Sequence, residues 1–219
     1  MRQRSAPKLT RLAELGQRWQ LLCDDLKVDK RQAHREGQRL ISSWDRLPRH
    51  YHDTTHLLAC LRGLEPVREH LNTPQACALA LWFHDAVYWP QRKDNEEQSA
   101  AWALNFMTTA GLDAKLRDVV VQLILETRHA ALPSVGDAQY VVDVDLGILG
   151  QSVEVYQRFE TNVRKEYRFV PEAAFKARRI GVLQGFLNRP RIYSTDWFYA
   201  QLEQQARINL TATIAGLQL

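Results

Sequence analysis

The stretch Leu79-Ala80-Leu81-Trp82-Phe83-His84-Asp85-Ala86-Val87-Tyr88 places two ionisable residues side by side at the end of an otherwise almost wholly apolar run. Burying a charge without a partner costs free energy, and an imidazole is nearly as awkward to bury. A cation satisfies both groups, because neutral His and ionised Asp both donate electron pairs. The alternative is a His and an Asp at a helix end that simply reach water. The surrounding sequence decides between the two.

Further candidate ligands lie upstream and downstream of this pair. His52 and His56 are four residues apart, so they share one face of a helix if that helix starts early enough to include both. Asp143 and Asp145 lie in an apolar context, where charged side chains are not expected. The order is therefore His, then His-Asp, then Asp, on three separate helices. A helical bundle with a metal ion in its core has room for such a set.

Helical signals recur along the whole chain. Thr73 and Pro74 start a helix that is apolar nearly all round and runs through Phe83 to Val87, which predicts a central, buried helix. Residues 140–146 have some strand character but are too isolated to form a sheet, so we place them in or entering a helix. We expect one all-α domain over 1–219, with the helices of 1–45 packed on it and those of 151–219 completing it. The other helices expected from apolar spacing, caps and stops cover about 9–26, 94–107, 113–129, 153–168, 171–187 and 194–219, and one more is entered from a loop at 49–56 and continues through Leu57, Leu58, Leu61 and Leu64.

Composition narrows the class of protein. The 219 residues are 45% hydrophobic and 25% charged, with a net charge of +4, which fits an anionic small molecule as well as a nucleic acid. The basic residues are scattered and not grouped with aromatic ones, which disfavours nucleic acid. No apolar run approaches the ~20 residues of a membrane span. Cys23, Cys60 and Cys77 lie far apart among apolar neighbours, as buried thiols do in a reducing compartment. We therefore expect a cytoplasmic protein without a membrane partner, and leave a homodimer open.

Seven short motifs together carry a family resemblance. They are Arg49-x-Tyr51-His52-x-x-x-His56, Phe83-His84-Asp85-x-x-Tyr88, Asp94-Asn95-Glu96-x-x-Ser99-Ala100, Thr127-x-His129, Asp143-x-Asp145-Leu146, Arg164-x-Glu166-Tyr167 and Ala206-Arg207-x-Asn209. The set resembles the HD superfamily of metal-dependent phosphohydrolases and, more narrowly, a bacterial subgroup of predicted HD phosphohydrolases. The resemblance covers most of the chain from Trp44 onward. It is specific for an HD-type helical bundle with a metal site in its core, and uninformative about the substrate.

The resemblance implies a set of metal ligands. His56 supplies the first imidazole, His84 and Asp85 are the doublet, and Asp145 is the closing carboxylate. Spacing alone leaves two exchanges open, namely His52 for His56 and Asp143 for Asp145. Mixed nitrogen and oxygen ligation suits Mn, Fe, Co, Ni or Zn better than Ca. Mg is an option that would keep more of its water.

The resemblance also implies roles around the metal. Glu96, His52 and His129 are the candidate catalytic residues, which position the attacking water or protonate the leaving group. The candidate substrate-binding residues are Arg49, Arg164, Arg207 and Asp143. The arginines would fork onto phosphate oxygens, although an arginine taken singly is more often solvated. For Asp143, a helix cap or an ion pair with an arginine is favoured over metal ligation.

The function expected from this reading is a metal-dependent phosphohydrolase acting on a small phosphorylated compound, a nucleotide or a related phosphate ester. Two alternatives come from other classes. A di-iron oxygenase of the same fold needs additional His ligands between the doublet and the last Asp, and only His129 lies there. A non-enzymatic module would use a degenerate site to bind a metal or a nucleotide, but the ligand set is complete.

Overall fold

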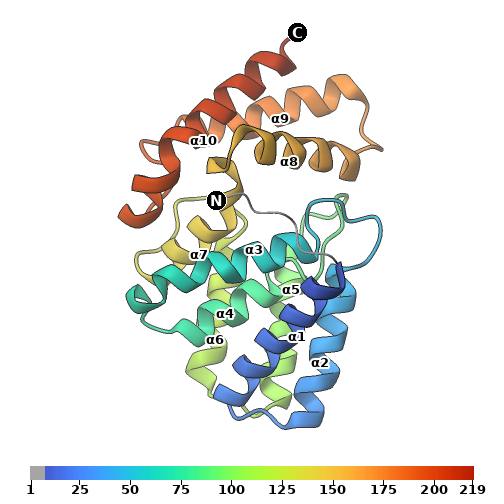
Figure 1. Ribbon diagram of the computed structural model, residues 1–219, viewed down its shortest axis with the longest axis vertical. Helices are drawn as coiled ribbons and strands as arrows, with labels where there is room; N and C mark the ends of the chain where they lie inside the picture. The colour runs from blue at the N-terminus through green and yellow to red at the C-terminus, as the bar shows by residue number, and fades with distance from the viewer. Residues whose placement is uncertain (1–7) are drawn as a thin grey trace.

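The computed structural model describes residues 8–219, which form helices joined by turns and loops (Figure 1). The prediction of an all-helical fold is confirmed for these residues. The first part of the predicted N-terminal region, residues 1–7, lies outside the described residues. Within residues 8–219, no helix combines the length and the apolarity that a bilayer crossing requires.

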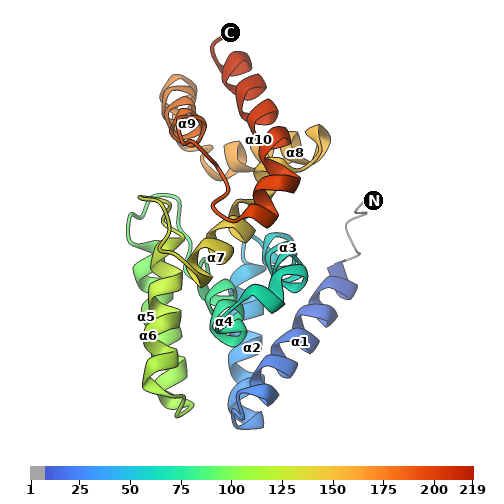
Figure 2. The same ribbon diagram turned by 90° about the vertical axis from the view of Figure 1, so that its left-hand side faces the viewer.

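Most of the helices form two groups at opposite ends of the molecule, with α7 between them (Figures 1 and 2). One group contains α1 (Lys8–Asp25), α2 (Lys30–Trp44), α3 (Thr54–Leu64), the 3₁₀ helix η1 (Glu65–His70), α4 (Pro74–Phe83), α5 (Asn95–Thr109) and α6 (Ala114–Glu126). The connection is made by α7 (Asp137–Asp145) and the 3₁₀ helix η2 (Leu146–Gly150). The other group contains α8 (Val153–Glu166), α9 (Glu172–Leu187) and α10 (Asp196–Leu217).

Helix α4 is the buried centre of the first group, as its apolar sequence predicts. It packs against α3, α5, α6 and α7, and seven of its ten residues are buried. It ends at Phe83, earlier than the predicted end at Val87. An α-helix pairs its carbonyls with the backbone N–H groups four residues later. The carbonyls of Asp85 and Ala86 accept instead from the guanidinium of Arg49, at 2.7 and 2.9 Å.

Helix α3 begins at Thr54 because Asp53 caps it. The Asp53 carboxylate accepts from the backbone N–H groups of Thr55 and His56, at 2.6 and 3.3 Å. His52 therefore lies before the helix, and the possibility that His52 and His56 share one helix face is wrong. The prediction that 140–146 is helical is confirmed, since most of this segment forms the C-terminal part of α7.

The C-terminal group is fixed to η2 by close packing and hydrogen bonds. A Cβ atom on Gly150 would lie 2.5 Å from Cβ of Leu202 on α10, so this crossing requires glycine. The side-chain amide of Asn209 donates to the carbonyls of Leu149 and Gln151, both at 2.8 Å. The 3₁₀ helix η2, which follows α7, thus holds α10, and α9 packs against α10.

Candidate metal centre

The doublet begins where α4 ends. His84 is the residue after the helix, and it is 1% exposed. Its Nδ1 lies 2.9 Å from the carbonyl oxygen of Leu81. A carbonyl only accepts, so Nδ1 carries a proton and Nε2 is the atom directed at the site. Metal-binding histidines are usually oriented in this way, by a hydrogen bond from the ring nitrogen that does not bind the metal.

Three side chains from three elements converge on one point. Nε2 of His56 lies 3.3 Å from Nε2 of His84 and 3.1 Å from Oδ1 of Asp145, and Nε2 of His84 lies 3.4 Å from the same oxygen. Ligand atoms bound at about 2.0–2.1 Å to one ion are separated by about 2.9–3.4 Å, depending on octahedral or tetrahedral geometry. The residues present therefore fit a divalent cation without rearrangement.

Asp85 stands at the side of this group. Its Oδ2 lies 3.5 Å from Nε2 of His84 and 4.0 Å from Nε2 of His52. Asp85 and Asp145 both line the large cavity of the protein, whereas His56 and His84 are covered by the helices behind them. The imidazoles thus close the back of the site, and the carboxylates form its open side.

Cys60, which its sequence context predicts only as a buried thiol, also belongs to the cluster. His56, Cys60, His84 and Asp145 each offer one ligand atom within 4.8 Å of the others. The Sγ atom lies 3.7 Å from both ring nitrogens of His56, one helical turn away on α3. Burial, and then the charges of Asp145 and Asp85, raise the pKa of the Cys60 thiol well above its ordinary value. The thiol lies farther from the His56 ring than Nε2 of His84 and Oδ1 of Asp145 do, at 3.3 and 3.1 Å, so we place Cys60 behind His56.

Histidines keep the Asp145 carboxylate ionised. Burial opposes its charge, but His84, His129 and His56 lower the pKa of Asp145 well below its ordinary value. Burial likewise opposes a charge on His84, while Asp85 and Asp145 raise its pKa to about 9. Metal binding at this site must therefore displace a proton, as it commonly does at His ligands.

His129 contacts the other oxygen of the same carboxylate. Its Nε2 lies 3.0 Å from Oδ2 of Asp145. Its Nδ1 is buried and has no hydrogen-bond partner among residues 8–219. The backbone of His129 is left-handed, with φ of +55°, which costs roughly 1 kcal/mol for a residue with a side chain. Such strain is kept where surrounding contacts enforce it, and here it turns the ring toward the cavity.

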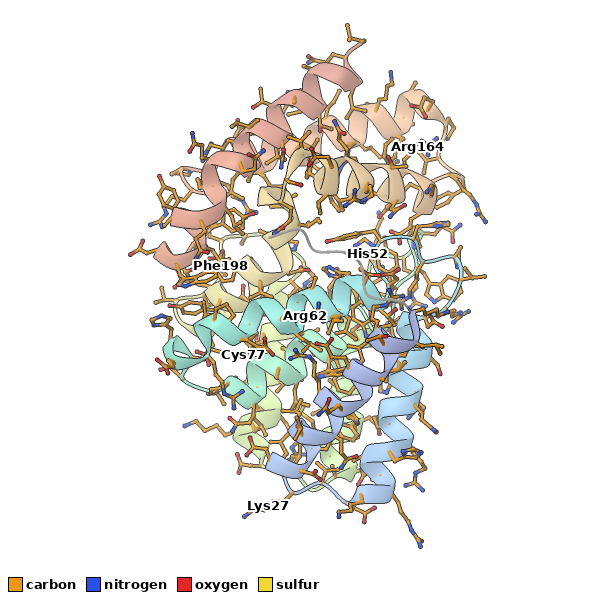
Figure 3. All side chains as sticks on the ribbon, viewed as in Figure 1. Lys27, His52, Arg62, Cys77, Arg164 and Phe198 are labelled. Carbon is orange, nitrogen blue, oxygen red and sulfur yellow. The ribbon has the colours of Figure 1, made fainter. Side chains whose placement is uncertain are left out.

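His52 is held by a residue to which the sequence analysis gave no role, Glu166 at the end of α8. Nδ1 of His52 lies 2.7 Å from Oε2 of Glu166, and the ring stacks on Tyr88 at 4.1 Å. Glu166 is 4% exposed and also accepts from the backbone N–H groups of residues 50–52 and from the Tyr88 hydroxyl. Figure 3 places His52 between the two groups of helices.

The charges of this pair reinforce each other. Burial opposes both, yet the hydrogen bond with His52 lowers the pKa of Glu166 to about 2, and the bond with Glu166 raises the pKa of His52. Glu166 is part of the Arg164-x-Glu166-Tyr167 motif, but the sequence does not show that it is buried. Its partner was invisible in the sequence, because 114 residues separate the two.

Glu96 lies in the first turn of α5 and lines the same cavity. Burial, assisted by the nearby Asp85 charge, raises the pKa of its carboxyl group. The structure therefore brings together all seven residues expected as ligands or catalytic groups. They are His52, His56, His84, Asp85, Glu96, His129 and Asp145.

None of the four expected substrate-binding residues lines this cavity. Arg49 donates to the carbonyls of His52, Asp85 and Ala86 and so ties the loop before α3 to the turn after α4. The Asp143 carboxylate is fully buried, and it accepts from the backbone of Ser194 and from both the backbone and the hydroxyl of Thr195.

Arg164 and Arg207 also bind backbone carbonyls. Arg164 donates to the carbonyls of Tyr167 and Val170 just beyond the end of α8, on the C-terminal group of helices (Figure 3). Arg207 donates to the carbonyls of residues 187, 189 and 190 and pairs with Glu203. A guanidinium offers several donors in a fixed fork, which suits the unpaired carbonyls at helix ends as well as it suits phosphate.

The cavity has a volume of about 1220 Å³ and lies between the cluster of candidate metal ligands and the C-terminal helices. One wall is polar and contains the cluster. The opposite wall belongs to α8 and α9 and is mainly apolar, with Phe159, Val163, Phe175, Val182, Leu183 and Phe186. A polar centre facing an apolar wall is the usual composition of a small-molecule site.

Comparison with known proteins supports the fold. No known family model and no curated protein matches the sequence. The structure is similar to the phosphodiesterase domain of the RhoPDE fusion protein from the choanoflagellate Salpingoeca rosetta, with a TM-score of 0.64 and 14% identity, covering 98% of this chain and 92% of that one. A second structure of the phosphodiesterase domain of Salpingoeca rosetta rhodopsin phosphodiesterase gives a TM-score of 0.66 and 13% identity, covering 98% and 88%. The chain thus shares the helical fold of phosphodiesterase domains.

Proposed function

We propose that the protein is a metal-dependent phosphohydrolase that cleaves a phosphate ester or anhydride of a small molecule, a nucleotide or a related compound. The observation that carries this proposal is the convergence of His56, His84 and Asp145, with Asp85 beside them, on the wall of a large cavity. The likeness to phosphodiesterase domains supports the same class of reaction.

His56, His84, Asp85 and Asp145 would hold the metal ion. Two imidazoles and two carboxylates favour Mn, Fe, Co, Ni or Zn, with Mg as a weaker option. When bound, such an ion supplies Lewis acidity, which acidifies water and neutralises charge on a phosphoryl oxygen. The hydrogen bond from Nδ1 of His84 to Leu81 keeps Nε2 available for this role.

The remaining polar residues of the cavity would move protons. His52 can donate a proton from Nε2 to the leaving oxygen, because Glu166 holds its other nitrogen and favours the protonated ring. Glu96 and His129 flank the carboxylates and can orient the attacking water. General acid–base catalysis of this kind typically contributes about 10²–10⁴-fold to a rate.

The apolar wall would bind the organic part of the substrate. Phe159 and Phe186 face the cavity from α8 and α9 and are suited to a base or another flat group. The cavity volume of about 1220 Å³ exceeds the upper end of the usual range for small-molecule sites, so it accommodates a nucleotide-sized compound.

The test is a screen of purified, metal-loaded protein against phosphate monoesters, diesters and nucleotides, with Mn, Co or Ni added and release of phosphate or pyrophosphate measured. We expect turnover that is lost in His84→Gln while the far-UV circular dichroism is unchanged. Absence of turnover on every compound, with metal bound at one ion per chain, would overturn the proposal.

The same preparation separates the alternatives. If the protein is a di-iron oxygenase, elemental analysis should find two irons per chain. Among residues 8–219, His129 is the histidine outside the candidate ligand set that contacts Asp145, so it is the candidate ligand for a second iron. A non-enzymatic module predicts metal and nucleotide binding without turnover.

A further inference from the structure

Six arginine and lysine residues line the cavity, and the charges of most of them are already neutralised by a carboxylate or solvated by water. They are Arg92, Lys93, Arg128, Arg178, Arg179 and Arg189. Three of the arginines form ion pairs, Arg92 with Asp94, Arg128 with Glu97 and Arg179 with Glu160. Lys93 and Arg178 are exposed, so water solvates their charges.

Arg189 differs from the other five. It is half-buried, and burial is the one influence that shifts the pKa of its guanidinium, which it lowers. No carboxylate of residues 8–219 pairs with it. Taking a charge out of water without a counter-charge costs free energy, and a guanidinium cannot lose its proton in a protein to avoid that cost.

The guanidinium of Arg189 is nevertheless held in place. Its Nη2 donates to the carbonyl oxygen of His129 at 3.1 Å, and its Cζ lies 4.7 Å from the ring centre of Phe186. His129 is the residue whose ring contacts Asp145, so Arg189 is anchored to the backbone of a residue that reaches the candidate metal ligands, in the same cavity. The guanidinium has five N–H donors, and most of them have no acceptor among residues 8–219.

We propose that Arg189 binds a phosphoryl oxygen of the substrate, the role that the sequence analysis assigned to Arg49, Arg164 and Arg207. This inference rests on the proposed function. A rigid, partly desolvated guanidinium without a counter-ion, in the same cavity as a cluster that fits a metal, is complementary to a phosphate group. Arg189 lies between α9 and α10, so the C-terminal helices supply an anion-binding group as well as the apolar wall.

The alternative is that Arg189 only ties the loop after α6 to the connection between α9 and α10. Inorganic phosphate is a probe that separates the two roles, because its binding requires no turnover. Titration calorimetry of metal-loaded wild type, Arg189→Gln and Arg189→Lys is the first measurement. Loss of the charged fork should weaken phosphate binding by about 10–100-fold in Arg189→Gln, with partial recovery in Arg189→Lys.

Arg191→Gln is the matched control. Arg191 lies two residues further along the same connection, also over an aromatic ring, but it is paired with Asp196 and does not line the cavity. Its replacement should leave phosphate affinity within about twofold of wild type. Unchanged phosphate affinity in folded Arg189→Gln would overturn the inference.

A second measurement uses the wild-type chain and does not depend on the folding of a variant. Phosphate should slow the modification of Arg189 by phenylglyoxal, followed by peptide mass spectrometry, and should leave Arg191 unaffected. Equal rates at Arg189 with and without phosphate would contradict the inference. If an ester is found that the wild type cleaves, KM should rise in Arg189→Gln more than kcat falls. Phosphate binding through Arg189 without turnover of any ester would instead contradict only the proposed function.

Discussion

Glu166, at the end of α8, connects the C-terminal helices to the candidate catalytic residue His52 through a hydrogen bond. Its carboxylate accepts from residues 50–52 and from Tyr88, so it orders the loop before α3 and fixes one nitrogen of the His52 ring. A carboxylate that receives so many hydrogen bonds stabilises the fold chiefly in its ionised form. This makes stability depend on pH in a defined direction.

We expect Glu166→Gln to destabilise the protein near neutral pH and less so in acid. The pKa of Glu166 is lowered from 4.5 to about 2, so its contribution is present above pH 4.5 and is lost as the pH falls toward 2. The shift corresponds to about 3 kcal/mol at most. Urea unfolding should show the difference from wild type shrinking by about 1 kcal/mol or more between about pH 6 and pH 3.5.

Glu172→Gln is the control for this prediction. Glu172 pairs with Arg164 at the surface, and its side chain is 63% exposed. Its removal should change the free energy of unfolding by about 0.5 kcal/mol or less at either pH. A constant difference between wild type and Glu166→Gln across the pH range would show that the carboxylate is not ionised more readily in the folded state.

Asp143 and Asp145 form a natural pair of variants, since they lie on the same turn of α7 but serve different partners. Asp145→Asn should abolish metal binding and leave the fold intact, because it removes a charge from the cluster. Asp143→Asn should keep the metal and cost about 1–3 kcal/mol, because Ser194 and Thr195 donate to different oxygens of the carboxylate and an amide replaces one of these acceptors with an NH2 donor. Elemental analysis and chemical unfolding measure the two effects, and metal loss in Asp143→Asn alone would reverse the assignment.

The sequence was informative about single residues where the chemistry of the site itself limits the choice. His84 and Asp145 stood among apolar neighbours, His56 was marked by its spacing from His52, and the family resemblance selected His56 and Asp145 as ligands; the structure brings the three within contact distance. Arginines carry no such signal. Whether Arg49 or Arg189 faces the cavity depends on which backbone carbonyls lie nearby in three dimensions, and those carbonyls belong to distant parts of the chain.

Helix α9 forms much of the apolar wall of the cavity, and two of its glycines leave open space there because they have no side chain. Gly181 and Gly185 lie one helical turn apart and both line the cavity, and a Cβ atom on either would meet nothing within 4 Å. Glycine inside a helix is less stable than leucine by roughly 0.5–1 kcal/mol. We infer that glycine is present at these two positions because a larger side chain would fill part of the cavity.

We expect Gly185→Leu to stabilise the protein slightly and to narrow the substrate range. The added side chain fills part of the cavity, so kcat/KM should fall at least about tenfold for nucleotide-sized esters. For esters with a small alcohol it should change by less than about threefold. Steady-state kinetics on the two classes, with thermal unfolding alongside, measures both effects.

Gly16→Leu is the matched control on α1. Gly16 is also helical with nothing within 4 Å of a Cβ atom, and it lies outside the cavity. It should give the same small stabilisation with no change in substrate preference. An equal loss on small and large esters in Gly185→Leu would mean that α9 does not contact the organic part of the substrate.

At the level of elements, local signals located helices better than they located helix ends. The start of α4 was marked by Pro74, and α4 does begin there. Its end at Phe83 depends on Arg49, which takes the carbonyls of the following turn. Because that contact is tertiary, the apolar pattern alone extended the helix to Val87 and placed His84 and Asp85 inside it.

In the whole molecule, the apolar core that stabilises the fold and the candidate metal site occupy different places. The apolar core runs from Leu15 on α1 to Ile214 on α10 and includes most of α4. The cluster lies at the edge of this core, where Asp85 and Asp145 reach the cavity. In the absence of an ion, a proton on His84, whose pKa is raised to about 9 by Asp85 and Asp145, partly compensates the charge of the carboxylates.

This separation predicts that a chelator weakens the protein without unfolding it. A ligand present at a hundred times its dissociation constant stabilises the folded state by about 2.7 kcal/mol, which for a chain of this size is a Tm shift of about 5–10 °C. We expect EDTA to lower Tm by this amount and to abolish turnover, with far-UV circular dichroism unchanged and both effects reversed by added metal. If removal of the ion instead unfolded the chain, the metal would be structural, because the core alone would then be insufficient to hold α3, α4 and α7 together. If Tm did not move in protein known to be loaded, the ion would lie somewhere other than among His56, His84 and Asp145, since a cation bound there links these three elements directly.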